Sequence, residues 1–371
     1  MAFNIPLFKV YMSSKVKDPL LDTLYSGYVT QGSQVEAFEY KLKEWLDVRY
    51  LNTTNSGTSA LQLALNLAGV KYKDKVISTA MTCTATNTAI RAVGGNIVWA
   101  DIEPLTGNID PRSVEVILKK QKDIKVVMIV HWGGYPCDLQ YFNYLAQKYG
   151  VKIIEDAAHA FGAKYYDKKI GAHSDFVCFS FQAIKHLTTV DGGAVVCREE
   201  SDWKRGKLLR WFGIDREAPR RDFRCEEDVK EAGFKYHMND VNATIGIHNL
   251  EDMNKIVGAH QENGLYYDQA LQGIPGITLL ERAPERLSAY WLYTILVENR
   301  KRFMESMLEK GITTSQVHSR NDLMTMFKDY YIDLPGVSEF VKKQVSIPVH
   351  WGVSKTDREY IVRAIKEIGG S

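Results

Sequence analysis

Short apolar runs alternate with amphipathic stretches along the first half of the chain. The apolar runs have the length and composition of buried strands and fall at residues 49–53, 75–79, 96–101, 125–130, 152–156, 176–181 and 193–197. Between them, residues 111–121 and 139–150 space their apolar side chains three and four positions apart, as helices do. Strands that alternate with helices indicate an α/β fold with a mostly parallel sheet covered on both faces. In such a sheet, ligands bind beyond the carboxyl ends of the strands.

The segments that flank this region predict further helices and a second unit. Residues 33–48 form an amphipathic helix with Ser33 as its N-cap, and its apolar face carries Val35, Phe38, Leu42, Trp45 and Leu46. A long helical segment is predicted from about Asn239 to Leu271. Strands near 277–281 and 293–299 and helices near 303–311 and 356–369 then indicate a smaller α+β unit. We therefore predict a large domain over residues 1–250 and a small C-terminal domain over residues 251–371.

Composition and charge exclude several classes of partner. The chain has 371 residues, of which 45% are hydrophobic, and 47 basic against 45 acidic residues give a net charge of +2. No global field therefore favours nucleic acid or an anionic membrane, and the longest apolar runs are too short to cross a bilayer. A local basic run, Arg216 to Arg224, either steers an anionic substrate or is a solvated loop.

The cysteines and the amino-terminal segment indicate the compartment. The five cysteines are widely spaced, which favours neither a disulfide framework nor a metal site. The first residues, MAFNIPLFKVYM, lack the pattern of a signal peptide. We expect a cytoplasmic protein without a bound metal.

Lys185 carries the strongest chemical signal. It follows an apolar strand in FSFQAIKHLTTVDGG, and Asp156 stands at the carboxyl end of the strand VKIIED. A desolvated lysine loses its proton readily and becomes a nucleophile. A carboxylate nearby would keep a pyridine nitrogen protonated, so that the ring accepts electrons. The pair suits a Schiff base between Lys185 and pyridoxal 5'-phosphate (PLP).

A glycine turn before a helix adds a phosphate site to this pair. In NTTNSGTSALQLALNLAG, Gly57 and Thr58 open an apolar helix that has no acidic side chain in its first turn. Free N–H groups and the helix dipole attract a phosphate there. Simpler interpretations remain for each element: an ordinary N-cap for this turn, a helix cap for Asp156, and a solvated charge for Lys185. Together the three elements favour a cofactor site.

The chain resembles the sugar-nucleotide aminotransferases, which are fold-type I PLP enzymes of the aspartate aminotransferase superfamily. The resemblance runs over nearly the whole chain and keeps its order. It is carried by SGYVTQGSQVEAFE, TNSGTSALQLAL, ADIEPLTGNIDP, VHWGGYPCDL, IIEDAAHAFGAKYYDKKIGAHSDFVCFSF, the Lys185 segment and GFKYHMNDVNATIG. It implies the fold of that superfamily, with a large domain and a smaller C-terminal one.

The resemblance also implies roles for individual residues. Lys185 would form the Schiff base and shuttle the proton, Asp156 would pair with the pyridinium nitrogen, and His159 would contact the ring hydroxyl. The phosphate would be bound by Gly57, Thr58 and Ser180. The substrate loops would contribute Thr30, Gln31, His318 and Arg320. Tyr290 is a further candidate for the pocket wall, with core packing as the alternative.

The chain departs from the family pattern at three points. Relatives usually stack an aromatic side chain on the cofactor ring where this chain has Cys83, and the sequence does not say what replaces it. The motif that reaches across the dimer to the phosphate reads GFKYH, so that Lys235 stands where asparagine is usual and His237 where arginine is usual. A cation facing phosphate is chemically sensible, although Lys235 in solvent is the alternative. Val190-Asp191 replaces Gly-Glu before the glycine pair, which predicts a changed turn.

The resemblance implies a homodimer that transfers an amino group from L-glutamate to a nucleotide-linked keto sugar. Sugars of the 4-keto-6-deoxy class are the commonest substrates in the family. The alternative within PLP chemistry is a sugar dehydratase, but dehydratases of this kind often carry histidine at the lysine position. A PLP-binding regulator is the alternative of another class, and this chain has no room for a DNA-binding domain before the first catalytic motif.

Overall fold

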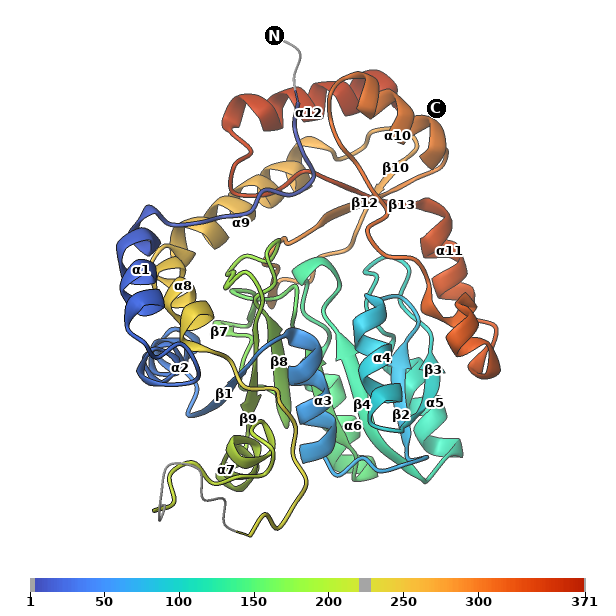
Figure 1. Ribbon diagram of the computed structural model, residues 1–371. Helices are drawn as coiled ribbons and strands as arrows, with labels where there is room; N and C mark the ends of the chain where they lie inside the picture. Colours follow the sequence, from blue (N-terminus) through green and yellow to red (C-terminus); the bar gives the residue numbers. More distant parts are fainter. Residues whose placement is uncertain (1–3, 220–227, 370–371) are drawn as a thin grey trace.

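The computed structural model describes residues 4–219 and 228–369, and a seven-stranded sheet forms its centre (Figure 1). The strand order is β1-β9-β8-β5-β4-β2-β3, and β9 alone runs antiparallel to its neighbours. The mostly parallel sheet predicted from the apolar runs is thus confirmed. Its strands are β1 (Tyr50–Thr54), β2 (Lys75–Thr79), β3 (Asn96–Ala100), β4 (Ile124–Val130), β5 (Lys152–Asp156), β8 (Phe176–Ser180) and β9 (Gly193–Cys197).

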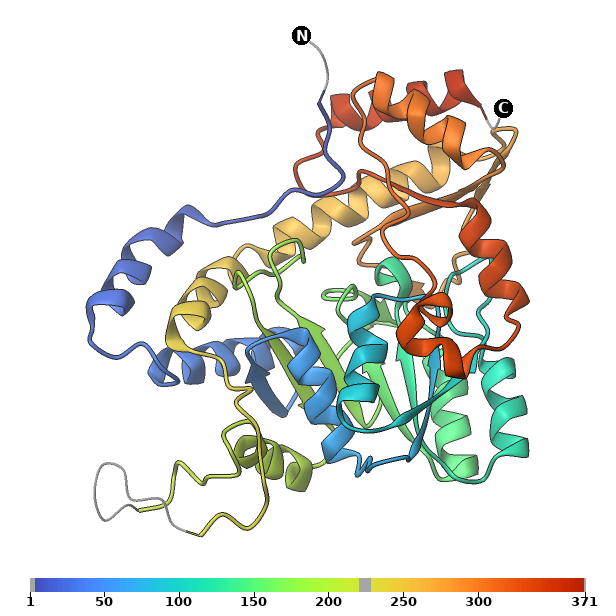
Figure 2. The same cartoon turned by 45° about the vertical axis from the view of Figure 1, so that its right-hand side comes forward.

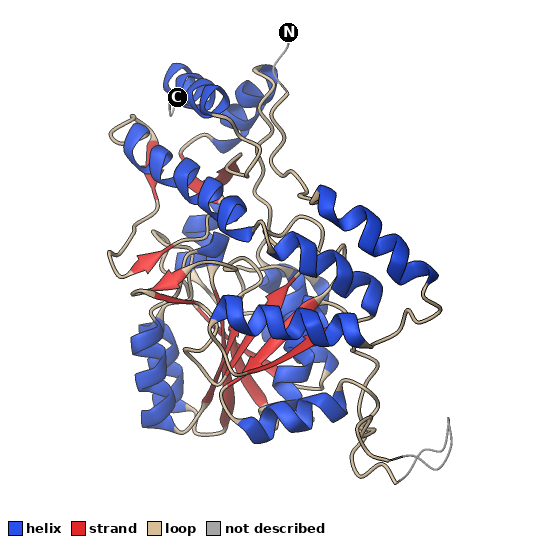
Figure 3. Cartoon of the chain, turned by 90° about the vertical axis from the view of Figure 1, so that its left-hand side faces the viewer, coloured by secondary structure: helices blue, strands red, loops and turns tan. Residues whose placement is uncertain are grey.

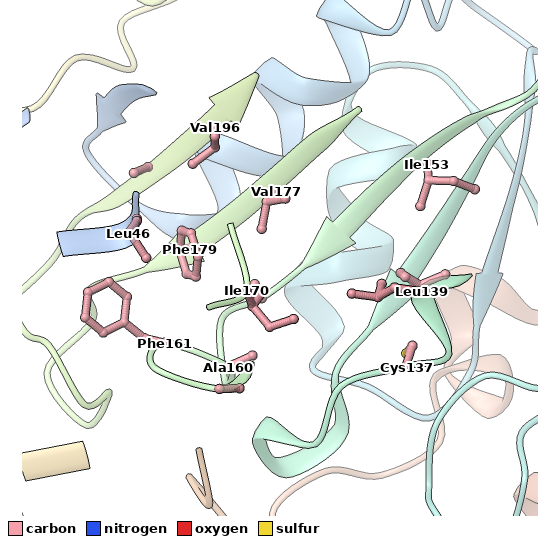
Figure 4. Close-up of a cluster of buried hydrophobic side chains, with 14 of the residues drawn as sticks. Leu46, Cys137, Leu139, Ile153, Ala160, Phe161, Ile170, Val177, Phe179 and Val196 are labelled. Atoms are coloured by element: carbon pink, nitrogen blue, oxygen red, sulfur yellow. The ribbon is translucent and has the colours of Figure 1, made fainter. Parts of the chain in front are cut away.

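Helices cover both faces of this sheet, because alternate side chains of each strand point to opposite sides. Val127 and Ile129 of β4 belong to one buried cluster, and Val126 and Met128 belong to the other. Figure 4 shows part of the first cluster, and Figure 3 shows the helices around the strands. The first face is covered by α2 (Ser33–Leu46), α5 (Pro111–Lys120), α6 (Leu139–Tyr149) and α8 (Asp240–Leu250). The second is covered by α3 (Gly57–Leu67), α4 (Thr84–Ala92) and α7 (Glu200–Leu209).

A smaller antiparallel sheet and its helices form the second unit, at the top of Figure 1. Its strands are β10 (Ile277–Leu279), β12 (Tyr293–Val297) and β13 (Gln344–Ile347), and its helices are α9 (Met253–Ala270), α10 (Arg300–Glu309), α11 (Pro335–Lys343) and α12 (Lys355–Ile368). A third buried cluster joins most of these elements, whereas Val337 and Phe340 of α11 belong to the second cluster. The amino-terminal segment belongs to the same layer, since Ile5 pairs with Ile312 (Figure 2).

Short elements complete the described chain. A small three-stranded sheet contains β6 (Lys164–Tyr165), β7 (Lys168–Lys169) and β11 (Arg286–Leu287). The remaining helices are α1 (Lys17–Tyr25), η1 (Ser14–Val16), η2 (Trp132–Gly134), η3 (Asn321–Leu323) and η4 (Thr325–Tyr330). Among the helices of the described ranges, none combines the length and the apolar character needed to cross a membrane.

Two local predictions were wrong. Ser33 is not the N-cap of α2: Gly32 occupies that position, and the carboxylate of Asp240 caps the helix from α8 by accepting from the N–H groups of Gly32 (2.7 Å) and Val35 (3.1 Å). The long helix predicted from about Asn239 to Leu271 is broken by a turn between α8 and α9, at residues 251–252. We propose that this break marks the boundary between the large and the small domain, which would then lie close to residue 250.

Candidate active site

A cavity of about 490 Å³ lies beyond the carboxyl ends of β4, β5 and β8, where a parallel sheet binds its ligands. Residues 315–318 of the smaller unit close it from the other side. Many of the residues predicted from the sequence meet here although they are far apart in the chain. Those that line the cavity are Gly57, Thr58, Cys83, Asp156, His159, Ser180, Lys185 and His318.

The start of α3 provides an anion site on the cavity wall. Ser56 caps the helix, with its hydroxyl accepting from the N–H of Ser59 at 3.1 Å, and the first turn carries no acidic side chain. Gly57 approaches the end of β8 so closely that an added Cβ would lie 2.7 Å from the Cβ of Ser180. Only glycine allows this approach, which leaves the helix N-terminus and the hydroxyls of Thr58 and Ser180 on the same cavity.

Asp156 is a buried carboxylate at the end of β5, with 5% of its surface exposed. Its Oδ2 accepts from the hydroxyl of Thr86 at 2.7 Å, and its Oδ1 accepts from the N–H of Ala158 at 3.1 Å. Burial raises the pKa of Asp156, while these hydrogen bonds and the charge of Lys185 oppose that shift. A cation bound beside it, such as a protonated pyridine nitrogen, would stabilise the ionised form.

Lys185 lies in the loop after β8, and its N–H donates to the carbonyl of Gln182 at 2.9 Å. Its Nζ is 3.6 Å from the ring centroid of Trp291. Burial lowers the pKa of Lys185 to about 8, and Cys83 and Asp156 partly oppose this shift. A lysine with this pKa holds a useful fraction of neutral amine near neutral pH, as a nucleophile requires.

His159 is a neutral ring with an unused nitrogen. Burial lowers its pKa well below the usual value, and its ring stacks on Trp291 with the centroids 3.8 Å apart. Its Nδ1 is buried, and no residue in the described ranges forms a hydrogen bond with it. His318 lies parallel to it at 5.5 Å, and burial lowers the pKa of His318 to about 4. A hydroxyl on a bound ring would supply the missing partner of His159.

Trp291 and Phe8 are cavity residues that the sequence analysis missed. They stack with centroids 5.1 Å apart, and both line the cavity with Cys83, the N-cap of α4. The only signal was the segment SAYWLY, in which Tyr290 was the candidate. Tyr290 is instead packed in the core of the smaller unit, and its hydroxyl donates to Asp268.

Thr30 and Gln31 lie away from the cavity. The carbonyl of Thr30 accepts from the N–H of Asp240 at 3.0 Å, and the carbonyl of Gln31 accepts from Arg216 at 3.0 Å. Gln31 lines a separate hollow that is rich in basic side chains. The basic run that begins at Arg216 continues into residues 220–224, which lie outside the described residues.

Lys235 and Arg320 also lie outside the lining of the cavity. The carbonyl of Lys235 accepts from the side-chain amide of Asn55 at 3.0 Å, just before the phosphate turn of its own chain. The guanidinium of Arg320 donates to Asp322 at 2.8 Å and to Ser338 at 2.7 Å. These contacts occupy Arg320 within the smaller unit, and the substrate role expected for it stays a prediction.

The turn before the glycine pair places a valine in the left-handed region, and whether it differs from the turn of relatives stays a prediction. Val190 adopts φ = 70°, which is a strained conformation for a β-branched residue. Its N–H donates to the hydroxyl of Thr188 at 2.9 Å, and the carbonyl of Asp191 accepts from Thr189 at 2.7 Å. These bonds hold the turn, and Asp191 lines the cavity.

The residues present fit PLP. The anion site at α3 matches a phosphate, Asp156 matches a pyridinium nitrogen, and the unpartnered Nδ1 of His159 matches a ring hydroxyl. Lys185 would supply the amine for the aldehyde carbon. All four groups border one cavity, so that a single ligand can meet them together.

Comparisons with known proteins agree with this site. The model of the DegT/DnrJ/EryC1/StrS aminotransferase family matches residues 11–366. The chain is 31% identical to the UDP-4-amino-4,6-dideoxy-N-acetyl-beta-L-altrosamine transaminase of Campylobacter jejuni, over 93% of this chain and 92% of the relative. It is also 31% identical to the dTDP-4-amino-4,6-dideoxy-D-glucose transaminase of Shigella dysenteriae, over 94% of this chain and 95% of the relative.

A solved structure gives the same result at the level of the fold. The sugar aminotransferase CalS13 from Micromonospora echinospora superposes with a TM-score of 0.93 at 34% identity, covering 98% of this chain and 99% of that one. Since the aminotransferases of the matched family are PLP-dependent, the cofactor inferred from the cavity is the one that the family uses. The chain belongs to the DegT/DnrJ/EryC1/StrS aminotransferase family and is a PLP-dependent sugar aminotransferase.

Proposed function

We propose that this enzyme moves the amino group of L-glutamate to the keto carbon of a nucleotide-linked 4-keto-6-deoxy sugar, producing an amino sugar for glycan biosynthesis. The observation that carries the proposal is the meeting of Lys185, Asp156 and the start of α3 on one cavity. The printed names of the relatives from Campylobacter and Shigella, which describe 4-amino-4,6-dideoxy sugars on a nucleotide, support the class of substrate.

Cofactor binding is assigned to groups that the fold holds in place. When bound, PLP supplies an aldehyde carbon that takes up the amino group and a ring that spreads an electron pair. The first N–H groups of α3 and the hydroxyls of Thr58 and Ser180 would bind the phosphate. Asp156 would hold a proton on the pyridine nitrogen, and Thr86 keeps its carboxylate oriented from 2.7 Å. His159 would orient the ring through its hydroxyl.

Proton movement is assigned to the Nζ of Lys185. Its pKa of about 8 leaves both the ammonium and the amine populated near neutral pH, so one atom can both accept and release a proton. Nζ would take the proton from the α-carbon of glutamate in one half-reaction and deliver a proton to the sugar carbon in the other. The buried His159 and His318 are neutral at this pH and do not compete for that proton.

We infer that the enzyme acts as a homodimer in which Lys235 reaches the phosphate of the partner's cofactor. Two observations support the idea: Lys235 is a cation that does not line the cavity of its own chain, and its backbone lies beside Asn55, near the phosphate turn. Thr30 and Gln31, which also lie away from their own cavity, would be contributed across the same boundary.

The experiment combines the enzyme, PLP, L-glutamate labelled with heavy nitrogen and UDP- or dTDP-linked 4-keto-6-deoxy sugars. Mass spectrometry of the sugar nucleotide should show the labelled amino group, and an enzymatic assay should find an equal amount of 2-oxoglutarate. The Lys185→Ala variant is the matched control and should give neither product. A sugar that loses oxygen without gaining nitrogen would identify a dehydratase instead.

The surroundings of His186 argue against that dehydratase. Its Nε2 lies 2.9 Å from the carbonyl of Ala289, and its side chain does not line the cavity. Of the two neighbouring residues, Lys185 faces the cavity and His186 packs against the Ala289 backbone. A regulator that only binds PLP would show no labelled product with any sugar, although it would still bind the cofactor.

A further inference from the structure

Trp291 makes two separate contacts with the loop that carries Lys185. The Nζ of Lys185 lies 3.6 Å from the centroid of the indole ring, within the range of a cation–π contact. The indole N–H donates to the carbonyl of Ile184 at 2.9 Å, one residue before the lysine. The ring thus meets the reactive amine, and the N–H fixes the backbone of the loop that carries it.

The indole is held firmly by its own surroundings. Trp291 is only 3% exposed, and its ring stacks on His159 and on Phe8. The residue before it, Tyr290, adopts φ = 50°, a left-handed conformation that costs free energy in a residue other than glycine. The carbonyl of Tyr290 lies 2.9 Å from Nδ1 of His260, a contact that helps to hold this backbone. The chain therefore maintains a strained turn that places Trp291 against Lys185.

The ammonium of Lys185 has few other groups to stabilise it. The titratable side chains around it are Cys83, Asp156, His159, His186 and His318. Burial lowers the pKa of each of these histidines, so their rings are neutral and carry no charge that could act on the ammonium. Among residues 4–219 and 228–369, no carboxylate lies within ion-pair distance of Nζ. The face of the indole is a favourable place for a cation that is largely removed from water.

We propose that Trp291 is a positioning residue for Lys185. Its ring face holds the ammonium beside the cofactor site whenever the amine is not bonded to the cofactor, and its N–H keeps the Ile184–Lys185 backbone in place. The proposal rests on the role of Lys185 in the proposed function and adds a residue that prepares the amine for each half-reaction.

The test measures the acidity of Lys185 in the full chain without cofactor. Lysines are labelled by reductive methylation with carbon-13 formaldehyde, and the signal of Lys185 is identified by its absence in Lys185→Arg. Trp291→Leu removes the ring and the N–H, whereas Trp291→Phe keeps a weaker π face. The pKa of Lys185 should fall by roughly half a unit to one unit in Trp291→Leu and by less in Trp291→Phe.

Trp203→Leu is the matched control. Trp203 also lies under a lysine, with the Nζ of Lys207 5.1 Å from its ring, and its N–H also donates to a carbonyl, that of Leu51 at 3.2 Å. It does not line the cofactor cavity, so its loss should leave the pKa of Lys185 unchanged. An unchanged or raised pKa in Trp291→Leu would overturn the proposal. If that variant does not fold, Trp291→Phe decides alone: a lowered value supports the proposal, and a value equal to or above that of the parent overturns it.

Hydrogen exchange tests the second contact. Both Trp291 variants lose the bond to the Ile184 carbonyl, so the amides of the loop that contains Ile184 and Lys185 should exchange faster than in the parent and in Trp203→Leu. Unchanged exchange in both variants would remove the loop-fixing part of the proposal. Neither measurement needs a sugar or turnover, so a failure of the proposed amino transfer can be told apart from a failure of this inference.

Discussion

Replacing Gly57 by alanine should weaken the binding of PLP without unfolding the protein. The added Cβ would lie 2.7 Å from Cβ, 3.0 Å from Oγ and 3.2 Å from Cα of Ser180. The last of these atoms is backbone at the end of β8, so a rotation of the Ser180 side chain cannot remove the overlap. The first turn of α3 must move away from the sheet, and the N–H groups that would bind the phosphate move with it.

The size of the effect follows from two opposing contributions. Overpacking of a well-packed contact costs about 1–3 kcal/mol. Alanine favours a helix over glycine by up to about 1 kcal/mol, which offsets part of that cost in the free energy of unfolding. The higher helix propensity of alanine does not restore the positions of the N–H groups that would bind the phosphate. PLP affinity should therefore fall by about fivefold to a hundredfold, while the unfolding free energy changes by at most about 2 kcal/mol.

The assay is a titration of the cofactor-free protein with PLP, followed by absorbance, beside thermal unfolding of the same samples. Gly258→Ala is the matched control, because Gly258 is also helical, lies in α9 and has no atom within 4 Å of an added Cβ. It should bind PLP as the parent does and gain about 0.5–1 kcal/mol of stability. If Gly57→Ala binds PLP as tightly as the parent, the close approach to Ser180 is not what builds the phosphate site.

Further variants test the remaining assignments. In Lys185→Ala, turnover should disappear while the circular dichroism spectrum is kept, and borohydride should no longer fix PLP to the protein; residual turnover at the parental rate would refute the role of Lys185. Lys235→Ala should weaken PLP binding by roughly 1.5–3 kcal/mol, the value of a charge-assisted hydrogen bond, and a fully active monomer would contradict the shared site. Burial lowers the pKa of Lys185 from 10.5 to about 8, so the unfolded chain binds more protons than the folded one between these pH values. The unfolding free energy of the cofactor-free parent should therefore rise by roughly 2–3 kcal/mol from pH 8 to 10.5, relative to that of Lys185→Ala. Denaturant titrations that show no pH dependence in this difference would refute the shift.

The large sheet was predictable because burial on both faces gives each strand a continuous apolar run. Helix α4 was absent from the sequence prediction, because its buried face lacks the pattern of apolar residues on which that prediction depends. Its buried side chains include Thr86 and Asn87, which are buried through hydrogen bonds to Asp156 and Asn321. A helix face that is buried through polar contacts has no hydrophobic period, so its partners must be known before the helix can be recognised.

The site was predictable to the extent that its residues lie in local motifs at strand ends. Lys185, Asp156 and Gly57 each follow or end a strand of the same sheet, and a parallel sheet brings such positions to one edge. Trp291 has no motif of this kind. It reaches the cavity because the left-handed conformation of Tyr290 turns the chain, and the sequence alone gives no sign of a positive φ at a tyrosine.

The two halves of the cavity are joined by a polar network that orders Asp156 before any cofactor binds. The hydroxyl of Thr86 gives its only proton to Asp156, so at the 2.9 Å contact between Thr86 and Thr82 the donor must be Thr82. The side-chain amide of Asn321 donates to the carbonyl of Thr82 at 3.0 Å, and Asn321 lies just beyond His318 in the smaller unit. A movement of this segment against α4 would therefore disturb both the wall that His318 forms and the bond that orients Asp156. Because hydrogen bonds link Asp156, Thr86, Thr82 and Asn321 in sequence, the carboxylate and the opposite wall keep a fixed relation, which a cofactor bound beside Asp156 would require.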